Sequence, residues 1–363
     1  MIPAVEFHNV TRSYGRNTII DSLNLKIEAN RFAVIFGAPA CGKSTLLRLL
    51  TGLDKPDSGE IVLRGKDVTH VASGNRNIGY VPQSFALYPH YSVADNIAYP
   101  LTLLGYSKHD TKPVVERTAE QLKITHLLQK KPDQCSGGEK QRVAIARGIV
   151  KNTDIFVLDD PLTGLDFKLR EQLFDDLREM QSSLNATFIY TTSDATEALM
   201  LAEEVHILDQ GKIVEAGLLE DVYAHPAHVR TMELLGFPEA NVFHGTLKGD
   251  GQCETALFTF SASLDANVAG GTPVHVTVRP QDIKINPPAD PSLIRCPVEI
   301  TLVEDLGGEL VIYLEANNIS LKSVVRHDEV DELTEGKAEI GIHPASLAIY
   351  AAAGGHTIGR GAA

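Results

Sequence analysis

Several features that define other classes of protein are scarce or missing in this sequence of 363 residues. No apolar run approaches the roughly 18 residues of a transmembrane helix, and the first residues lack the basic and apolar segments of a secretory signal. Aromatic residues make up only 6% and the formal net charge is −14, which disfavours binding to nucleic acid or to anionic lipid. We therefore expect a protein that stays in the cytosol, binds no nucleic acid and reaches a membrane only through a partner.

Cysteine is also scarce, and its spacing fits neither a metal site nor a disulfide framework. The four cysteines are Cys41, Cys135, Cys253 and Cys296. We predict four reduced thiols.

The sequence pattern divides the chain into two parts, and a length of 363 residues also favours two domains. Residues 1–236 alternate short apolar runs with helical patterns, which is typical of an α/β layer structure. Within them, residues 88–150 have amphipathic helical patterns and little strand signal, so we predict a helical subdomain. Residues 237–363 are rich in alternating strands, which predicts a separate β domain, and we expect the tail after Ala351 to be disordered. Buried strands are predicted at 32–36, 155–158, 187–191 and 204–208.

The first motif with clear chemistry fits G-x-x-x-x-G-K-[ST] and lies between a predicted strand and a predicted helix. Backbone N–H groups of such a turn wrap a phosphate. Lys43 would reach the β- and γ-phosphates, and Ser44 would ligate Mg²⁺ together with Asp159 at the end of a second buried strand. The predicted nucleotide-binding residues here are Gly37, Ala38, Pro39, Ala40, Cys41, Gly42, Lys43, Ser44 and Thr45. The pattern predicts a site for a nucleoside triphosphate.

The segment Cys135–Arg142, which reads C-S-G-G-E-K-Q-R, resembles the signature motif of ABC transporter ATPases. By residue type alone, Ser136 and Glu139 form a capping box that starts a helix. Gly137 and Gly138 leave that helix N-terminus bare for the approach of an anion. In the family this anion is the γ-phosphate of ATP bound to the other subunit, so the resemblance implies composite sites and a dimer.

Other residues occur in the order that this family has. Tyr14, in S-Y-G, resembles the aromatic residue that stacks on adenine, and Gln83, in V-P-Q, resembles the glutamine that senses the nucleotide and the metal. The segment from Thr163 to Asp166 resembles the loop that crosses the dimer interface, with Gly164 where Asn is more usual.

The second part of the chain resembles the regulatory β domain of maltose-type importer ATPases at Phe237–Phe243, Val278–Pro280 and Gly341–Pro344. The resemblance implies an α/β P-loop NTPase with a RecA-like core, an antiparallel β subdomain and a helical subdomain, followed by a C-terminal OB/TOBE-like β-barrel domain. It also implies ATP and Mg²⁺ as cofactors and two transmembrane permease subunits as partners. An extracytoplasmic solute-binding protein would be an indirect partner at the inner (plasma) membrane.

Two departures from the family fall on residues that hydrolyse ATP. Asp160 replaces the glutamate that acts as general base, and its side chain is shorter by roughly 1.5 Å; a misplacement of about 1 Å can cost about a hundredfold in rate. Ser193 replaces the switch histidine, and a hydroxyl cannot carry a proton near neutral pH as imidazole does. With Gln83, these are the candidate catalytic residues. A milder departure is Pro39-Ala40, where the family usually has Ser-Gly.

Binding residues are therefore kept while hydrolysis residues are altered. This asymmetry predicts a heterodimer, in which this chain holds a slow site and its signature motif completes the active site of a second ABC ATPase subunit. A homodimer with slow hydrolysis, a non-transport ABC protein and a free-standing nucleotide regulator remain open alternatives. The resemblance implies a sugar, polyol, glycerol or glycerol-phosphate as the imported solute.

Overall fold

A computed structural model of the chain describes residues 2–84, 86–164, 166–265, 268–329 and 335–362. Contacts within the chain group its residues into two compact units, Met1–Leu219 and Glu220–Ala363. Each unit has its own hydrophobic core. The four cysteines carry free thiols, as the sequence predicts.

The boundary between the two units follows Leu219, earlier in the chain than the boundary that we expected after residue 236. Two short helices, α7 (Leu219–Ala224) and α8 (Val229–Leu234), lie between these positions. Met232 of α8 is buried against Tyr350 of the C-terminal strands. This apolar contact places α8 with the second unit, which the sequence pattern alone did not indicate.

A six-stranded sheet of order β10-β9-β3-β8-β7-β6 forms the centre of the N-terminal unit. Its strands are β3 (Phe32–Phe36), β6 (Gly79–Val81), β7 (Ile155–Asp159), β8 (Thr187–Thr192), β9 (Glu204–Asp209) and β10 (Lys212–Leu218). All pairings are parallel except that of β10 with β9. Every residue of β3, β7 and β8 is buried, as expected for parallel strands covered on both faces. The four predicted buried strands are confirmed.

A smaller antiparallel sheet of order β2-β1-β4-β5 accompanies the central sheet. Its strands are β1 (Val5–Tyr14), β2 (Asn17–Ile27), β4 (Ser58–Leu63) and β5 (Lys66–Asp67). Helix α1 (Lys43–Thr51) contacts β2 of this sheet and β7 and β8 of the central one. Its buried leucines share one core with both sheets, which fixes the start of α1 beside the ends of β7 and β8.

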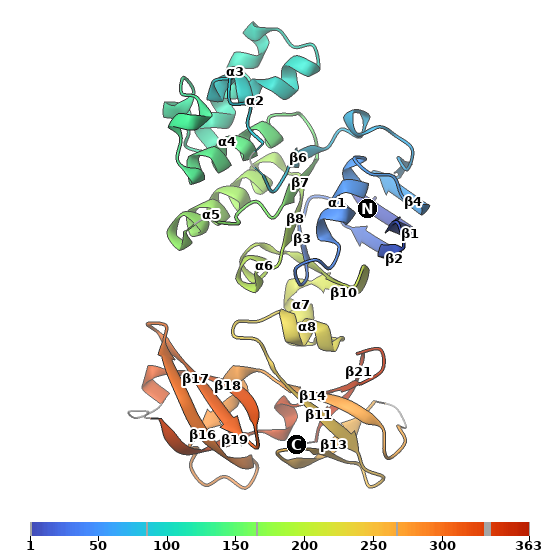
Figure 1. Ribbon diagram of the computed structural model, residues 1–363, viewed down its shortest axis with the longest axis vertical. Coiled ribbons are helices and arrows are strands. Elements are labelled where there is room, and N and C mark those ends of the chain that lie inside the picture. Colours follow the sequence, from blue (N-terminus) through green and yellow to red (C-terminus); the bar gives the residue numbers. More distant parts are fainter. Residues whose placement is uncertain (1, 85, 165, 266–267, 330–334, 363) are drawn as a thin grey trace. The chain divides into compact units, whose positions relative to one another are not determined.

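The remaining helices of the N-terminal unit flank the central sheet. Helices α2 (Val93–Leu103), α3 (Lys108–Gln121) and α4 (Gly137–Ile149) contact one another within the stretch 88–150 and gather at one end of this unit (Figure 1). Two more are α5 (Phe167–Leu184) and α6 (Ala195–Leu201). Among the residues that the structure describes, none of the helices is both long and apolar enough to cross a membrane.

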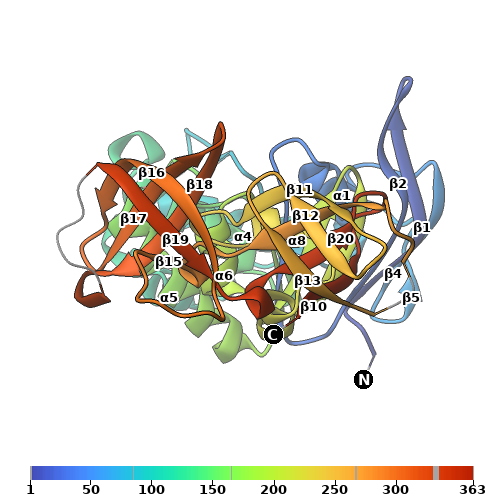
Figure 2. The same cartoon turned by 90° about the horizontal axis from the view of Figure 1, so that it is seen from below.

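The C-terminal unit consists of a closed barrel beside a five-stranded sheet, as Figures 1 and 2 both show. The barrel has the order β11-β12-β13-β21-β20-β14 and contains β11 (Asn241–Leu247), β12 (Gln252–Thr255), β13 (Thr259–Leu264), β14 (Pro273–Val278), β20 (Ala348–Ala351) and β21 (Thr357–Gly361). The sheet has the order β15-β19-β16-β17-β18 and contains β15 (Ile283–Ile285), β16 (Ile294–Asp305), β17 (Glu309–Ala316), β18 (Ile319–Arg326) and β19 (Gly336–Ile342). The predicted β domain with a barrel is confirmed.

The expectation of a disordered tail after Ala351 is wrong. Residues 357–361 form β21, which pairs with both β13 and β20 and closes the barrel. Main-chain hydrogen bonds on both sides order this segment although it has few apolar side chains.

Candidate functional site

The loop between β3 and α1 has the shape of an anion cradle. Ala40 (φ 63°) and Gly42 (φ 115°) both have left-handed backbone conformations, which turn the chain into the helix. A Cβ on Gly37 would lie 2.2 Å from the carbonyl oxygen of Leu208, so only glycine fits there. Gly42 supplies no side-chain cap to α1, so the N–H groups of its first turn remain for an anion.

Lys43, at the first position of α1, is buried and points back over this loop. Its Nζ donates hydrogen bonds to the carbonyl oxygens of Gly37 at 2.8 Å and Ala38 at 3.0 Å. These bonds hold the ammonium group above the cradle, where a phosphate would gain from its charge.

Ser44 and Asp159 bring two oxygen ligands together beside the cradle. The Ser44 Oγ donates to Oδ1 of Asp159 at 3.3 Å, and burial raises the pKa of the Asp159 carboxyl above its usual range. A bound cation would offset the cost of burying this carboxylate. Mg²⁺ suits the position, because it prefers oxygen ligands from protein side chains and from the phosphates of a nucleotide. The residues present therefore fit the magnesium ion that the sequence predicts.

Asp160 follows Asp159 in a strained backbone conformation, with φ 47°. Its N–H donates to Thr191, to the carbonyl oxygen at 3.1 Å and to Oγ1 at 3.2 Å. Its Oδ2 accepts a hydrogen bond of 3.4 Å from the amide Nε2 of Gln83, which lies in the loop after β6. The two bonds to Thr191 fix the main chain, so a backbone shift cannot make up for the short side chain of Asp160 without breaking them.

Tyr14, at the end of β1, is held beside the loop by polar contacts of its hydroxyl and ring. Its hydroxyl donates to Asp54, and the guanidinium of Arg12 lies 4.7 Å from its ring centroid. Arg48 Nε of α1 donates to the same carboxylate at 2.9 Å. Tyr14 is 43% exposed and lines the pocket, so it is accessible to a planar base.

These predicted residues meet in one pocket of about 460 Å³. Its lining residues are Tyr14, Ile19, Pro39, Ala40, Gly42, Lys43, Ser44, Thr45, Gln83, Asp159, Asp160 and Ser193. Ser193 is exposed and follows the end of β8. Gly37, Ala38 and Cys41 belong to the same loop but do not line this pocket. Sequence reasoning missed Ile19 in the lining and Thr191 behind it; the only available signal for Thr191 was its place at the end of a buried strand.

The signature motif does not line this pocket. Ser136 caps α4 with the predicted capping box: its Oγ accepts from the N–H of Glu139 at 3.3 Å, and Glu139 Oε2 accepts from the N–H of Ser136 at 2.7 Å. A Cβ on Gly137 would meet nothing within 4 Å, whereas one on Gly138 would lie 2.0 Å from Cδ2 of Leu169. Gly137 therefore leaves the helix end open, while Gly138 packs closely against the Leu169 side chain of α5.

Asp166 also lies outside this pocket, at the start of α5. Its carboxylate caps that helix by accepting from the N–H of Leu169 at 3.0 Å. Leu165, in the motif that precedes it, lies outside the described residues. The predicted site residues thus form two groups: the nucleotide pocket, and the helix ends that carry Ser136 and Asp166.

This arrangement defines the class of P-loop nucleoside triphosphatases, and comparison with known proteins gives the family. The family profile described as ABC transporter matches residues 20–163. The chain is 36% identical over 288 residues to the spermidine/putrescine import ATP-binding protein PotA of Haemophilus influenzae, which covers 78% of this chain and 77% of that protein. It is 35% identical over 347 residues to the maltose/maltodextrin import ATP-binding protein MalK of Yersinia pestis, which covers 94% of this chain and 93% of that one.

A solved structure shares the fold of more than half of the chain. The dimeric ATP-binding cassette MJ0796 in a post-hydrolysis state, bound to ADP and Pi, aligns with a TM-score of 0.54 at 28% identity and covers 59% of this chain and 98% of its own. The chain belongs to the ATP-binding proteins of ABC transporters. It is an ATPase of this family, and its cofactors are ATP and Mg²⁺.

Proposed function

We propose that this chain drives an importer of small organic solutes and that its own nucleotide site is the slower half of an unequal pair. The observation that carries the proposal is Asp160, because it lines the nucleotide pocket where the general base would act. The groups that bind the phosphates and Mg²⁺ are retained at Lys43, Ser44 and Asp159. Asp160 and Ser193 lack the reach and the titrating group that efficient hydrolysis needs.

Within this proposal the residues have separate tasks. The loop that begins at Gly37 binds the phosphates together with Lys43. Ser44 and Asp159 hold Mg²⁺, and Tyr14 orients the adenine base. Mg²⁺, when bound, supplies the charge that stabilises the transferring phosphoryl group. Asp160 accepts a proton from water only weakly, since general acid–base assistance of about 10²–10⁴ in rate depends on placement. This chain therefore binds ATP but hydrolyses it slowly, so the nucleotide stays bound for longer than at an efficient site.

The proposed partner is a second, different ABC ATPase subunit. Ser136 and Gly137 lie away from the chain's own pocket, and the open position of Gly137 leaves room for the γ-phosphate of a nucleotide on another subunit. Asp166 would lie in the same interface. With this geometry the intact signature motif of this chain would complete the faster site of the partner.

The heterodimer is tested by ATP turnover in a complex reconstituted with its permease. Asp160→Asn is introduced in this chain, and a parallel complex has the matching base of the second ATPase subunit replaced. We expect the first change to leave most turnover and transport intact and the second to abolish both. Loss of turnover with Asp160→Asn alone would contradict the proposal and favour a homodimer in which Asp160 is the working base.

We also propose that two transmembrane permease subunits hold the chain at the cytoplasmic face of the inner (plasma) membrane. A groove of about 590 Å³ between α2 and α3 offers a place for a permease segment, with Tyr91 and Tyr99 at its wall and their rings 5.9 Å apart. In a strain that expresses the permease, Ala98→Arg in this groove should release the chain from the membrane fraction. Nucleotide binding should not change. A chain that never follows the membrane, with permease present, would instead favour a free-standing regulator.

The solute that we infer is a sugar or polyol, including glycerol and glycerol-phosphate, delivered by an extracytoplasmic binding protein. The support is coverage: the likeness to the maltose/maltodextrin protein extends over 94% of this chain, whereas that to the polyamine protein covers 78%. Uptake of labelled maltose, glycerol and putrescine by cells with and without this chain tests the inference. Dependence of putrescine uptake alone on the chain would overturn it.

A further inference from the structure

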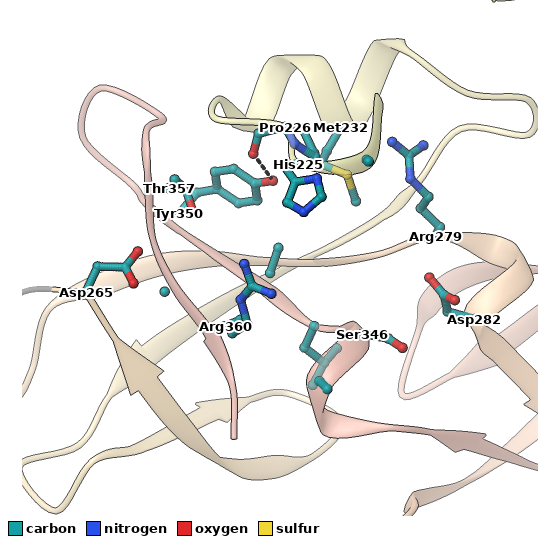
Figure 3. A pocket seen from close by; sticks show the side chains of 15 residues that line it. His225, Pro226, Met232, Asp265, Arg279, Asp282, Ser346, Tyr350, Thr357 and Arg360 are labelled. Carbon is teal, nitrogen blue, oxygen red and sulfur yellow. Dashed lines mark hydrogen bonds between the residues drawn. The ribbon is translucent and has the colours of Figure 1, made fainter. Parts of the chain in front are cut away.

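A second cavity, of about 300 Å³, lies within the C-terminal unit and shares no residue with the nucleotide pocket. Its walls come from the segment after α7, from α8, from the ends of β13 and β14, and from β20 and β21 (Figure 3). Tyr350 fixes the covering segment to the barrel, since its hydroxyl donates to the carbonyl oxygen of Pro226 at 3.0 Å. The volume is at the lower end of the range for small-molecule sites, about 300–1,000 Å³.

Charged side chains of both signs face this cavity. Arg279 and Arg360 are the cations, Asp265 and Asp282 are the anions, and the imidazole of His225 also lines the cavity (Figure 3). Among the described residues, no ion pair within 4.0 Å involves Arg360, Asp265 or Asp282. Opposite charges that share one small cavity are thus kept apart rather than paired.

Arg279 is held in place by other groups. Its guanidinium donates to the carbonyl oxygens of Tyr223 at 2.7 Å and Leu235 at 3.0 Å, and it stacks over the Tyr223 ring at 3.8 Å. The carboxylate of Asp282 interacts electrostatically with the Arg279 guanidinium but forms no ion pair with it within 4.0 Å. Burial raises the pKa of the Asp282 carboxyl, and Arg279 opposes the rise only in part. The half-buried carboxylate therefore lacks the direct cationic partner that would offset its desolvation.

We propose that this cavity binds a small zwitterion, with the cationic group of the ligand against Asp282 and its carboxylate against Arg360. The two side chains are more than 4 Å apart, so a short ligand with separated charges can pair with both at once. A dication of the same length would leave Arg360 facing a positive group, and a dianion would leave Asp282 facing a negative one. A ligand placed between Asp282 and Arg360 is therefore favoured when it has one charge of each sign.

Four probes with the same four-carbon backbone test the charge pattern by calorimetric titration of the full chain. They are γ-aminobutyrate (zwitterion), putrescine (dication), succinate (dianion) and 1,4-butanediol (neutral). We expect γ-aminobutyrate to bind and each of the other three to bind at least about tenfold more weakly. The absence of measurable binding by γ-aminobutyrate, or tighter binding of putrescine or succinate, would overturn the proposal.

Two variants locate the site. Asp282→Asn and Arg360→Gln should each weaken γ-aminobutyrate binding by about tenfold to hundredfold, the usual effect of losing a charge-assisted hydrogen bond. Asp328→Asn and Arg326→Gln are matched controls, because they remove the same charges from exposed positions of this unit outside the cavity. Circular dichroism checks folding, and Arg360 is exposed enough for its variant to fold. Unchanged binding by Arg360→Gln would place the ligand elsewhere and refute the assignment.

Discussion

Thr191 lies directly opposite Asp159 on the neighbouring parallel strand, and its hydroxyl donates a hydrogen bond to Oδ1 of Asp159 at 3.0 Å. Oγ1 of Thr191 in turn accepts a hydrogen bond from the N–H of Asp160 at 3.2 Å. One buried side chain thus positions both Asp159 and Asp160, the residues that we propose for the metal and for the attacking water.

Thr191→Val should therefore weaken the site although the two side chains have nearly the same shape. The change removes one of the two hydrogen bonds that Oδ1 of Asp159 accepts and one of the two acceptors of the Asp160 N–H. Each lost bond costs about 0.5–1.5 kcal/mol of unfolding free energy. We expect a higher Mg²⁺ concentration to be needed for ATP binding, measured by titration of nucleotide fluorescence.

Thr187→Val is the matched control on the same strand. Thr187 Oγ1 is buried and accepts the N–H of Asn30 at 2.9 Å, remote from the nucleotide pocket. It should lower stability in urea by a similar amount without changing the Mg²⁺ requirement. An equal Mg²⁺ requirement for the two variants would contradict the positioning role of Thr191.

The two glycines of the signature motif separate function from packing. Gly138→Ala forces a Cβ to within 2.0 Å of Leu169, so we expect a loss of about 1–3 kcal/mol in stability from overpacking. Gly137→Ala meets nothing within 4 Å and should leave stability equal or slightly higher, because alanine favours the helix.

In a complex with the second ATPase, Gly137→Ala should nevertheless reduce turnover, since its methyl group occupies the approach of the γ-phosphate. Urea unfolding of the chain and steady-state ATP turnover of the complex measure the two effects. Normal turnover by Gly137→Ala would mean that this helix end does not face a nucleotide.

The contact of Asp54 with Arg48 and Tyr14 makes stability depend on pH in the acid range. Arg48 first, and then the Tyr14 hydroxyl, lower the pKa of Asp54 from 3.8 to about 2. Because the folded-state pKa lies below the unfolded value, this stabilisation is fully present above about pH 4 and is lost as the pH falls toward about 2.

Asp54→Asn should thus reduce stability at pH 5 and flatten the decline of unfolding free energy between pH 4 and pH 2. It should also weaken ATP binding, because the Tyr14 ring loses its anchor. Urea unfolding across this pH range is the measurement, with the exposed Asp133→Asn as the control. If the two variants give parallel pH profiles, Asp54 does not supply the linkage.

Local patterns were sufficient for the parts of the site that are continuous in sequence. The phosphate loop and the strand that ends at Asp159 each have a motif or an apolar run that predicts position and chemistry. The capping box of Ser136 and Glu139 is likewise visible, because its two partners are three residues apart.

Contacts between distant segments were not predictable. The Tyr14–Asp54 hydrogen bond and the packing of Gly138 against Leu169 join residues that are 40 and 31 positions apart and depend on how the elements pack. Composition misled at the C-terminus, where pairing of β21 on both sides outweighs its few apolar side chains. The cavity of Asp282 and Arg360 is likewise assembled from separate strands and has no local signature.

The most direct test of the central claim is single-turnover ATP hydrolysis by the complex with the second ATPase subunit, whose own general base is replaced, when this chain carries Asp160→Glu and Ser193→His combined. These changes supply the longer base and the imidazole without altering Lys43, Ser44 or Asp159. We predict that hydrolysis becomes at least about a hundredfold faster than in the unmodified chain, with ATP affinity nearly unchanged. Hydrolysis by the unmodified chain that is already as fast as that of the double variant, and is abolished by Asp160→Asn, would show that this site is a full catalytic site.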